Sequence, residues 1–184
     1  MSRIRKATVT RKTKETDISI ELQLDSLEPS VIESGVPFFD HMLTSMSRHG
    51  RFHLTLRCDG DTEIDDHHTV EDIGLTLGEA FKQALGEKKG ITRFSDVTIP
   101  MDDALAKTSI DLSGRAFFNF AGIDGNDLKG YIASYSEELT LEFLRAFSSS
   151  AAINIHVEVF YGSNSHHIHE SIFKSLGIAL YKSC

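Results

Sequence analysis

Two related stretches decide how this chain is organised: HHTVEDIGLTLGEA at residues 67–80 and HHIHESIFKSLGIA at residues 166–179. Laid over each other without a gap, they match at two histidines, a glutamate, an isoleucine, a leucine, a glycine and an alanine. The first stretch continues to Leu85 with apolar residues on one face, which predicts an amphipathic helix stopped at Gly86. The second predicts a helix from about His166 to Tyr181. An internal repeat of this kind indicates a chain built from two related halves.

Outward from these motif helices, the same order of elements recurs. The first half is predicted to hold strands at 4–13, 16–24 and 51–57. A helix is expected to begin at Pro37 and to have Gly50 at its C-cap. Asp65 and Asp66 are placed at the N-cap of the motif helix. The second half is predicted to hold strands at 94–99, 105–112, 116–121 and 152–161 and a helix at 136–149. This order predicts an α+β fold of two β-β-α-β-α halves, residues 1–88 and 89–184, in one compact unit with the two motif helices side by side against their sheets.

Composition limits the classes of function. The chain has 184 residues, of which 40% are hydrophobic and 25% charged, as in globular proteins. A net charge of −8 argues against a nucleic acid or an anionic membrane as partner. Cys58 and Cys184 allow at most one intrachain disulfide, which fits a reducing compartment. Because the first residues contain no apolar leader and no run is long enough to span a bilayer, we expect a cytoplasmic protein.

The motif pairs histidine with glutamate at helical spacing. His67 and Glu71 are four residues apart and His68 and Glu71 three apart, so either histidine can face the same point as the glutamate. Adjacent histidines diverge by about 100° around a helix and cannot easily bind one ion together. Two motifs therefore suggest a pair of ions, each drawing ligands from both motif helices. His41 and Glu142 occupy equivalent places on the two earlier helices and can complete the coordination shells of the two ions.

One motif copy alone is more typical of exposed or capping histidines, and it is the repetition that favours a metal site. A set rich in imidazole, containing carboxylates and lacking thiols, suits six-coordinate Mn²⁺ or Fe²⁺ better than structural Zn²⁺, although other divalent first-row metals remain open. The predicted metal ligands are His41, His67, His68, Glu71, Glu142, His166, His167 and Glu170.

Five segments of the chain carry a family resemblance: residues 35–43, 65–74, 100–104, 111–115 and 165–174. Together they resemble imidazoleglycerol-phosphate dehydratase, the dehydratase of histidine biosynthesis, in the right order and nearly end to end. The resemblance implies a hydro-lyase, a carbon–oxygen lyase that converts imidazoleglycerol phosphate to imidazoleacetol phosphate. It also implies a duplicated ferredoxin-like fold of the ribosomal protein S5 domain 2 type and a shell of 24 subunits, with two Mn²⁺ in each active site between subunits. Some members have histidine where this chain has Glu142, which is either a substituting ligand or a departure.

The resemblance also implies roles for individual residues. It assigns acid/base chemistry to Glu15. Without the resemblance, the local sequence predicts that Glu15 is a solvated turn residue. The resemblance assigns substrate phosphate binding to Arg93, Arg115 and Lys174, each of which alone is more often a surface cation, and His49 is expected to line the pocket. The catalytic set is predicted to comprise Glu15, His41, His67, Glu71, His167 and Glu170. Relatives continue into a Ser-x-Lys segment that helps bind phosphate, whereas this sequence ends at Cys184; without that segment we expect weaker substrate binding, with metal binding and fold less affected.

The histidine–glutamate motifs alone are compatible with two other functions. Paired metals also activate water in dinuclear hydrolases, although the bridging aspartate clusters common in those enzymes are absent. Alternatively, the ions hold the subunits of a storage or structural shell together. Replacement of Glu15 by glutamine distinguishes these functions from that of a dehydratase. If the chain is a dehydratase, the substitution should abolish turnover and leave metal content and assembly intact.

Overall fold

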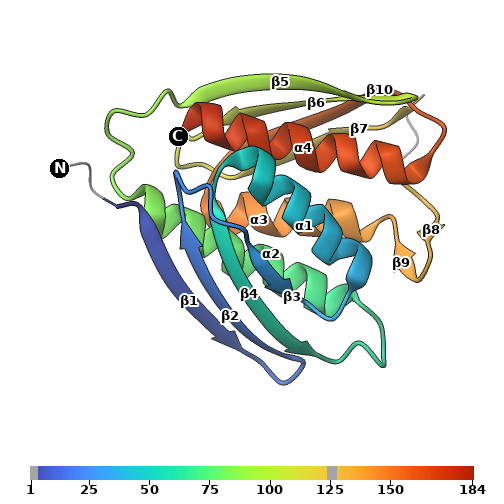
Figure 1. The fold of residues 1–184 in the computed structure, drawn as a ribbon, viewed down its shortest axis with the longest axis horizontal. Helices are drawn as coiled ribbons and strands as arrows, with labels where there is room; N and C mark the ends of the chain where they lie inside the picture. Colours follow the sequence, from blue (N-terminus) through green and yellow to red (C-terminus); the bar gives the residue numbers. More distant parts are fainter. Residues whose placement is uncertain (1–3, 124–127) are drawn as a thin grey trace.

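The computed structural model describes residues 4–123 and 128–184, in which four helices lie between two four-stranded sheets (Figure 1). The first half contains β1 (Lys6–Lys12), β2 (Thr16–Gln23), β3 (Val31–Glu33), α1 (Pro37–Gly50), β4 (His53–Gly60) and α2 (His67–Leu85). The second contains β5 (Phe94–Met101), β6 (Ala104–Asp111), β7 (Phe117–Ala121), β8 (Tyr131–Ile132), β9 (Tyr135–Ser136), α3 (Leu139–Ala151), β10 (Asn154–Tyr161) and α4 (Ser165–Ser183). None of these helices is both long and apolar enough to cross a membrane.

The two sheets have the same topology, which confirms the duplicated α+β fold. Their strand orders are β1-β2-β4-β3 and β5-β6-β10-β7, so equivalent strands take equivalent places. In each sheet the strand before the first helix pairs in parallel with the strand after it: β3 with β4, and β7 with β10. The short strand β3 and the β8–β9 pair were not predicted. The start of the helix predicted at 136–149 was also wrong, because Ser136 pairs in β9 and α3 begins only at Leu139.

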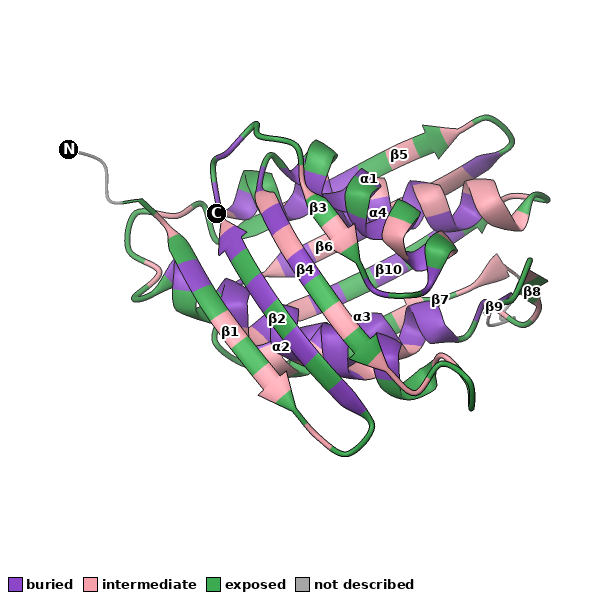
Figure 2. Ribbon diagram, turned by 60° about the horizontal axis from the view of Figure 1, so that its bottom comes forward, coloured by how far each residue is buried: buried purple, intermediate pink, exposed green. Residues whose placement is uncertain are grey.

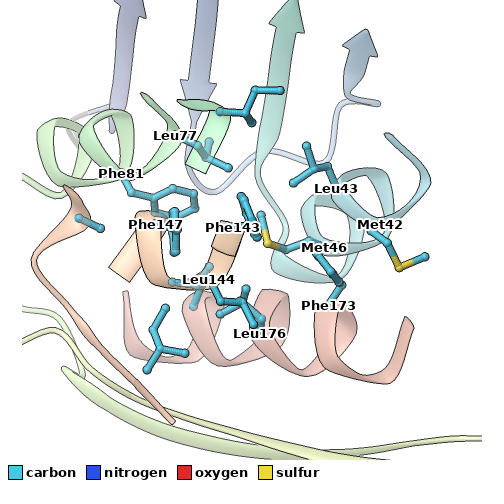
Figure 3. Packing of buried hydrophobic residues seen from close by; sticks show 14 of the residues in the cluster. Met42, Leu43, Met46, Leu77, Phe81, Phe143, Leu144, Phe147, Phe173 and Leu176 are labelled. Atoms are coloured by element: carbon cyan, nitrogen blue, oxygen red, sulfur yellow. The ribbon is translucent and has the colours of Figure 1, made fainter. Parts of the chain in front are cut away.

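The core lies between the sheets, around the helices. Along β2 and β6 every second residue is buried, which leaves one face of each sheet against the helices and the other facing outward, as the alternating colours of the β1, β2 and β4 strands in Figure 2 show. Phenylalanines from α3 and α4 fill the centre, where the ring of Phe143 stacks 5.9 Å from that of Phe147 and 5.6 Å from that of Phe173 (Figure 3). Offset aromatic stacking adds to the free energy gained by burying these large side chains.

The motif helices do not lie side by side, contrary to the prediction. Helix α2 packs against α3 and α4 against α1, so each motif helix takes its main helical partner from the other half. Matched glycines allow these close crossings: a Cβ at Gly78 would lie 2.7 Å from the Phe147 carbonyl oxygen, and one at Gly177 only 2.3 Å from that of Met46. The glycine that the two motifs share therefore permits the close packing of each motif helix on its partner.

Besides the start of α3, two helix caps differ from prediction. Helix α2 runs from His67 to Leu85 as expected, but it is Asp65, not the N-cap Asp66, whose carboxylate accepts the His67 N–H (2.8 Å). Gly50 is not a C-cap residue: it is the buried last residue of α1, and Arg51 takes the left-handed conformation with φ of 50°. Gly50 is needed for space, because a Cβ there would lie 2.6 Å from the Phe52 ring.

Candidate metal centre and active site

Three of the predicted ligands meet where α1 and α4 begin. His41, His166 and Glu170 each offer one ligand atom, and these atoms all lie within 4.8 Å of one another. In residues 4–123 and 128–184, this is the one group of three or more potential metal ligands so arranged. The His166 ring lies 5.3 Å from that of His41, centroid to centroid. Because the α1–α4 crossing brings these helices together, the cluster follows from the fold.

Glu170 has one carboxylate oxygen for the histidines and one for a lysine. Its Oε2 lies 3.5 Å from Nε2 of His166, and its Oε1 accepts a bond from Nζ of Lys174 at 3.0 Å. Burial acts to raise the pKa of Glu170, but the hydrogen bond and charge of Lys174, together with the charges of His41 and His166, outweigh it, and the pKa lies below its usual value. The carboxylate is therefore ionised near neutral pH. His49, whose pKa is lowered by burial and then by Lys174, lies in the same neighbourhood.

The first motif repeats this arrangement less completely. Nε2 of His67 lies 3.9 Å from Oε2 of Glu71, as expected from their spacing on α2. Glu142, on α3, accepts a hydrogen bond from Arg145 at 2.6 Å. It does not join His67 and Glu71 in a group with ligand atoms within 4.8 Å. Within one chain, the first motif thus supplies only some of the ligands that a metal ion would need.

The second histidine of each motif is held by an aspartate that sequence reasoning missed. Nδ1 of His68 lies 3.0 Å from Oδ2 of Asp61, and Nδ1 of His167 lies 2.5 Å from Oδ1 of Asp103. The hydrogen bond with Asp61 raises the pKa of His68. Hydrogen bonds from His167 and then Ser163 hold the pKa of Asp103 well below its usual range. Asp103 lies in the segment 100–104 that carried the resemblance, but nothing in the sequence says which histidine it meets.

Glu15 is exposed in the β1–β2 turn, close to the first motif. The hydroxyl of Thr13 accepts the backbone N–H of Glu15 (3.1 Å), and the carbonyl of Glu15 accepts the N–H of Asp61 (3.1 Å). The same Asp61 binds His68, so the turn and the histidine share one anchor. The negative charge of Glu15 is among the influences that raise the pKa of His68, which indicates their proximity.

A buried polar contact, also missed from sequence, fastens this turn to α2. Asp72 follows the motif glutamate and is 7% exposed. Its Oδ1 accepts Nε of Arg11 at 2.8 Å, and its Oδ2 accepts the hydroxyl of Thr16 at 2.6 Å. Since Arg11 and Thr16 flank the turn, Asp72 fixes the position of Glu15 relative to the motif.

The two predicted phosphate-binding arginines lie far from the histidines of the same chain. The backbone N–H of Arg93 bonds Ser183 at the end of α4, and 17 residues of helix, about 25 Å, separate Ser183 from His166. The Arg115 carbonyl bonds Asn154 at the start of β10, and β10 runs about 23 Å before the chain turns into α4. Arg93 is engaged by Asp111 at 2.8 Å. The structure thus separates a histidine end, where both motif helices begin at the right of Figure 1, from an arginine end.

A pocket opens beside the first motif. Its volume is about 470 Å³, and its lining includes Gly35, Asp65, Asp66, His67 and Glu138. These residues come from the starts of α1, α2 and α3. The histidine end therefore offers space for a small molecule next to potential metal ligands.

Comparison with known proteins gives one consistent result. Residues 34–180 match the family model described as imidazoleglycerol-phosphate dehydratase. The protein of that name from Oceanobacillus iheyensis is 48% identical over 98% of this chain and 92% of its own length, and that from Pelobacter propionicus is 49% identical over 96% and 89%.

Solved structures agree with the sequence comparison. The crystal structure of imidazoleglycerol-phosphate dehydratase from Staphylococcus aureus superposes with a TM-score of 0.82 at 33% identity, covering 96% of this chain and 98% of that one. The enzyme from Pyrococcus furiosus, solved in complex with (S)-C348, gives a TM-score of 0.79 at 35% identity, covering 95% and 92%.

Proposed function

This chain belongs to the imidazoleglycerol-phosphate dehydratase family, and from that premise we propose that it uses two divalent cations, Mn²⁺ in the first instance, to remove water from imidazoleglycerol phosphate. It is a dehydratase of histidine biosynthesis and acts on a small phosphorylated imidazole. Removal of a proton from carbon and of a hydroxide from the neighbouring carbon gives an enol, which becomes the ketone imidazoleacetol phosphate.

The residues at the histidine end fit divalent cations. Two ligands about 2.1 Å from one ion lie about 3 Å apart at right angles and about 4.2 Å apart when opposite. The separations in the group of His41, His166 and Glu170 approach that range. Neither Cys58 nor Cys184 belongs to this group, so imidazole and carboxylate are the donors that it offers. The residues that would hold the cations are His41, His67, His68, Glu71, His166, His167 and Glu170, with Glu142 as a further candidate.

The chemical difficulty is a proton on a carbon with no carbonyl beside it. A bound divalent cation would supply Lewis-acid stabilisation of the negative charge that develops on the substrate's imidazole. Glu15 takes the proton, from a turn held by Asp61 and Asp72. Lys174 contributes positive charge beside Glu170 for the phosphate-bearing substrate.

The complete site requires more than one subunit. The separation of the arginine end from the histidine end, about 25 Å along α4, is the observation that carries this part of the proposal. Arg93 and Arg115 of one subunit serve the phosphate of a substrate bound at the histidines of another. Assembly into a 24-subunit shell would bring such ends together many times over.

The test is an assay with the metal added and removed. Protein stripped by chelation is incubated with imidazoleglycerol phosphate, with and without Mn²⁺, and the ketone product is measured together with inorganic phosphate. Ketone formed only with Mn²⁺, without phosphate release, supports the proposal. Phosphate release instead favours a dinuclear hydrolase, and a stripped protein that remains fully active refutes the metal dependence.

A further inference from the structure

The second histidine of each motif has one ring nitrogen fixed by a carboxylate. Nδ1 of His68 lies 3.0 Å from Asp61, and Nδ1 of His167 lies 2.5 Å from Asp103. An ionised carboxylate can only accept a hydrogen bond, so Nδ1 carries the proton in both rings. The lone pair of the neutral imidazole then lies on Nε2. Each ring is thus prepared to bind a cation through one particular atom.

The two aspartates reach their histidines from places that the duplication does not relate. Asp61 follows β4 and precedes His68 by seven residues in the same half. Asp103 lies in the turn between β5 and β6, whose counterpart in the first half is the β1–β2 turn that carries Glu15. Because the same contact occurs at unrelated positions, it is not inherited from the repeat. It points to a requirement of the site itself.

Both aspartates are held in place by their surroundings. Asp103 Oδ2 accepts the backbone N–H groups of Ser163 (2.8 Å) and Asn164 (2.9 Å) and the hydroxyl of Ser163 (2.7 Å). The backbone of Asp61 bonds Glu15, and its side chain is 14% exposed. Its second oxygen, Oδ1, is buried and has no hydrogen-bond partner in the part of the chain that the structure describes. Because the one side-chain hydrogen bond of Asp61 within the described residues goes to His68, this half-buried carboxylate serves that histidine more than the fold.

We propose that Asp61 and Asp103 are positioning residues, which fix His68 and His167 as Nδ1–H tautomers so that Nε2 is their cation-binding atom. The inference rests on the proposed function, since it presupposes that the motif binds a cation. Carboxylates that orient metal-binding histidines in this way commonly contribute 10–100-fold to metal affinity. Asp61 has a second consequence: through Glu15 it ties the orientation of His68 to the position of the acid/base carboxylate.

The experiment measures metal affinity rather than activity. Metal-free wild type, Asp61→Asn and Asp103→Asn are titrated with Mn²⁺, and free Mn²⁺ is followed by electron paramagnetic resonance. Asparagine keeps the size but removes the charge and allows either tautomer. Asp59→Asn is the matched control, because Asp59 is exposed near the end of β4, two residues before Asp61, and does not contribute to the pKa shift of His68. Melting of each metal-free protein is followed by circular dichroism.

We expect Asp61→Asn and Asp103→Asn to weaken Mn²⁺ binding about 10- to 100-fold, with metal-free melting temperatures near wild type and Asp59→Asn unchanged. If Asp103→Asn disturbs its loop and lowers the melting temperature, Asp61→Asn, whose carboxylate bonds no backbone group, decides the question. Wild-type affinity in Asp61→Asn at unchanged stability overturns the inference while leaving the proposed function intact. A wild type that binds no Mn²⁺ refutes the metal dependence first and the positioning role with it.

Discussion

Removal of the Asp72 carboxylate is expected to loosen the turn that carries Glu15. In Asp72→Ala, the buried hydroxyl of Thr16 loses its 2.6 Å partner and Arg11 its 2.8 Å partner. Each of these is a hydrogen bond to an ionised carboxylate, and loss of one costs about 1.5–3 kcal/mol. The Thr16 hydroxyl keeps a 3.2 Å contact with the hydroxyl of Thr13, so the lower end applies to it. The Arg11 side chain is 39% exposed and regains water, so the lower end applies to it. The expected loss of unfolding free energy is about 3 kcal/mol.

Urea unfolding of the metal-free protein, followed by circular dichroism at one protein concentration, measures this loss. For a chain of this size, about 3 kcal/mol corresponds to a fall in melting temperature of roughly 6–12 °C. Thr16→Val, which removes only the hydroxyl, should cost about 1–2 kcal/mol. Asp17→Ala is the control: Asp17 is 54% exposed and pairs with Lys12 on the surface, where such pairs contribute about 0–1 kcal/mol.

The same substitution separates positioning from folding. Displacement of a reacting group by about 1 Å can reduce turnover on the order of 10²-fold. At a temperature where Asp72→Ala is folded, kcat should therefore fall strongly while KM changes little. An Asp72→Ala protein as stable as Asp17→Ala, with wild-type kcat, would contradict the anchoring role of Asp72.

Three further results are expected. Gly177→Ala should destabilise the protein by at least about 2 kcal/mol in urea unfolding, because the new Cβ would lie 2.3 Å from the Met46 carbonyl; a stability equal to wild type would contradict the close α1–α4 crossing. His169 is buried, and burial lowers its pKa to about 4, so the unfolded state binds more protons between about pH 6.5 and 4. Unfolding free energy should therefore fall as pH drops through that window, by at most about 1.4 kcal/mol per unit from this group, and His169→Gln should flatten the slope; an equal slope in both proteins would exclude His169 as its source. Glu15→Gln should abolish turnover while Mn²⁺ content, measured by elemental analysis, stays at the wild-type level; loss of assembly on this change would favour a structural role for the ions instead.

Much of the fold could be predicted because the repeat is long and periodic. The bounds of α2 follow from its apolar spacing and Gly86, and the order of elements from the alternation of strands such as β2 and β6. Strand β3 was missed because three residues are too short to show a period. The prediction that the two motif helices pack on each other was wrong because packing depends on the shapes of the helix surfaces. The matched Gly78 and Gly177 indicated only that each motif helix crosses some neighbour closely.

The site could be predicted as a list of residues but not as an arrangement. His41, His166 and Glu170 do come together, and each motif pairs its first histidine with its glutamate. Asp103 was not recognised as a partner of His167, 64 residues away, because such contacts depend on tertiary structure. For the same reason, no spacing in the sequence places Arg93 at the opposite end of α4 from His166.

In the proposed active site, both motifs converge on two cations between subunits. Anomalous diffraction from crystals grown with Mn²⁺ tests this most directly. It should show two peaks in each site, each within about 2.2 Å of a histidine from the first motif and one from the second, with an arginine end of another subunit nearby. Absence of peaks, or peaks bound by one motif alone with Nε2 of His68 and His167 turned to solvent, would contradict it.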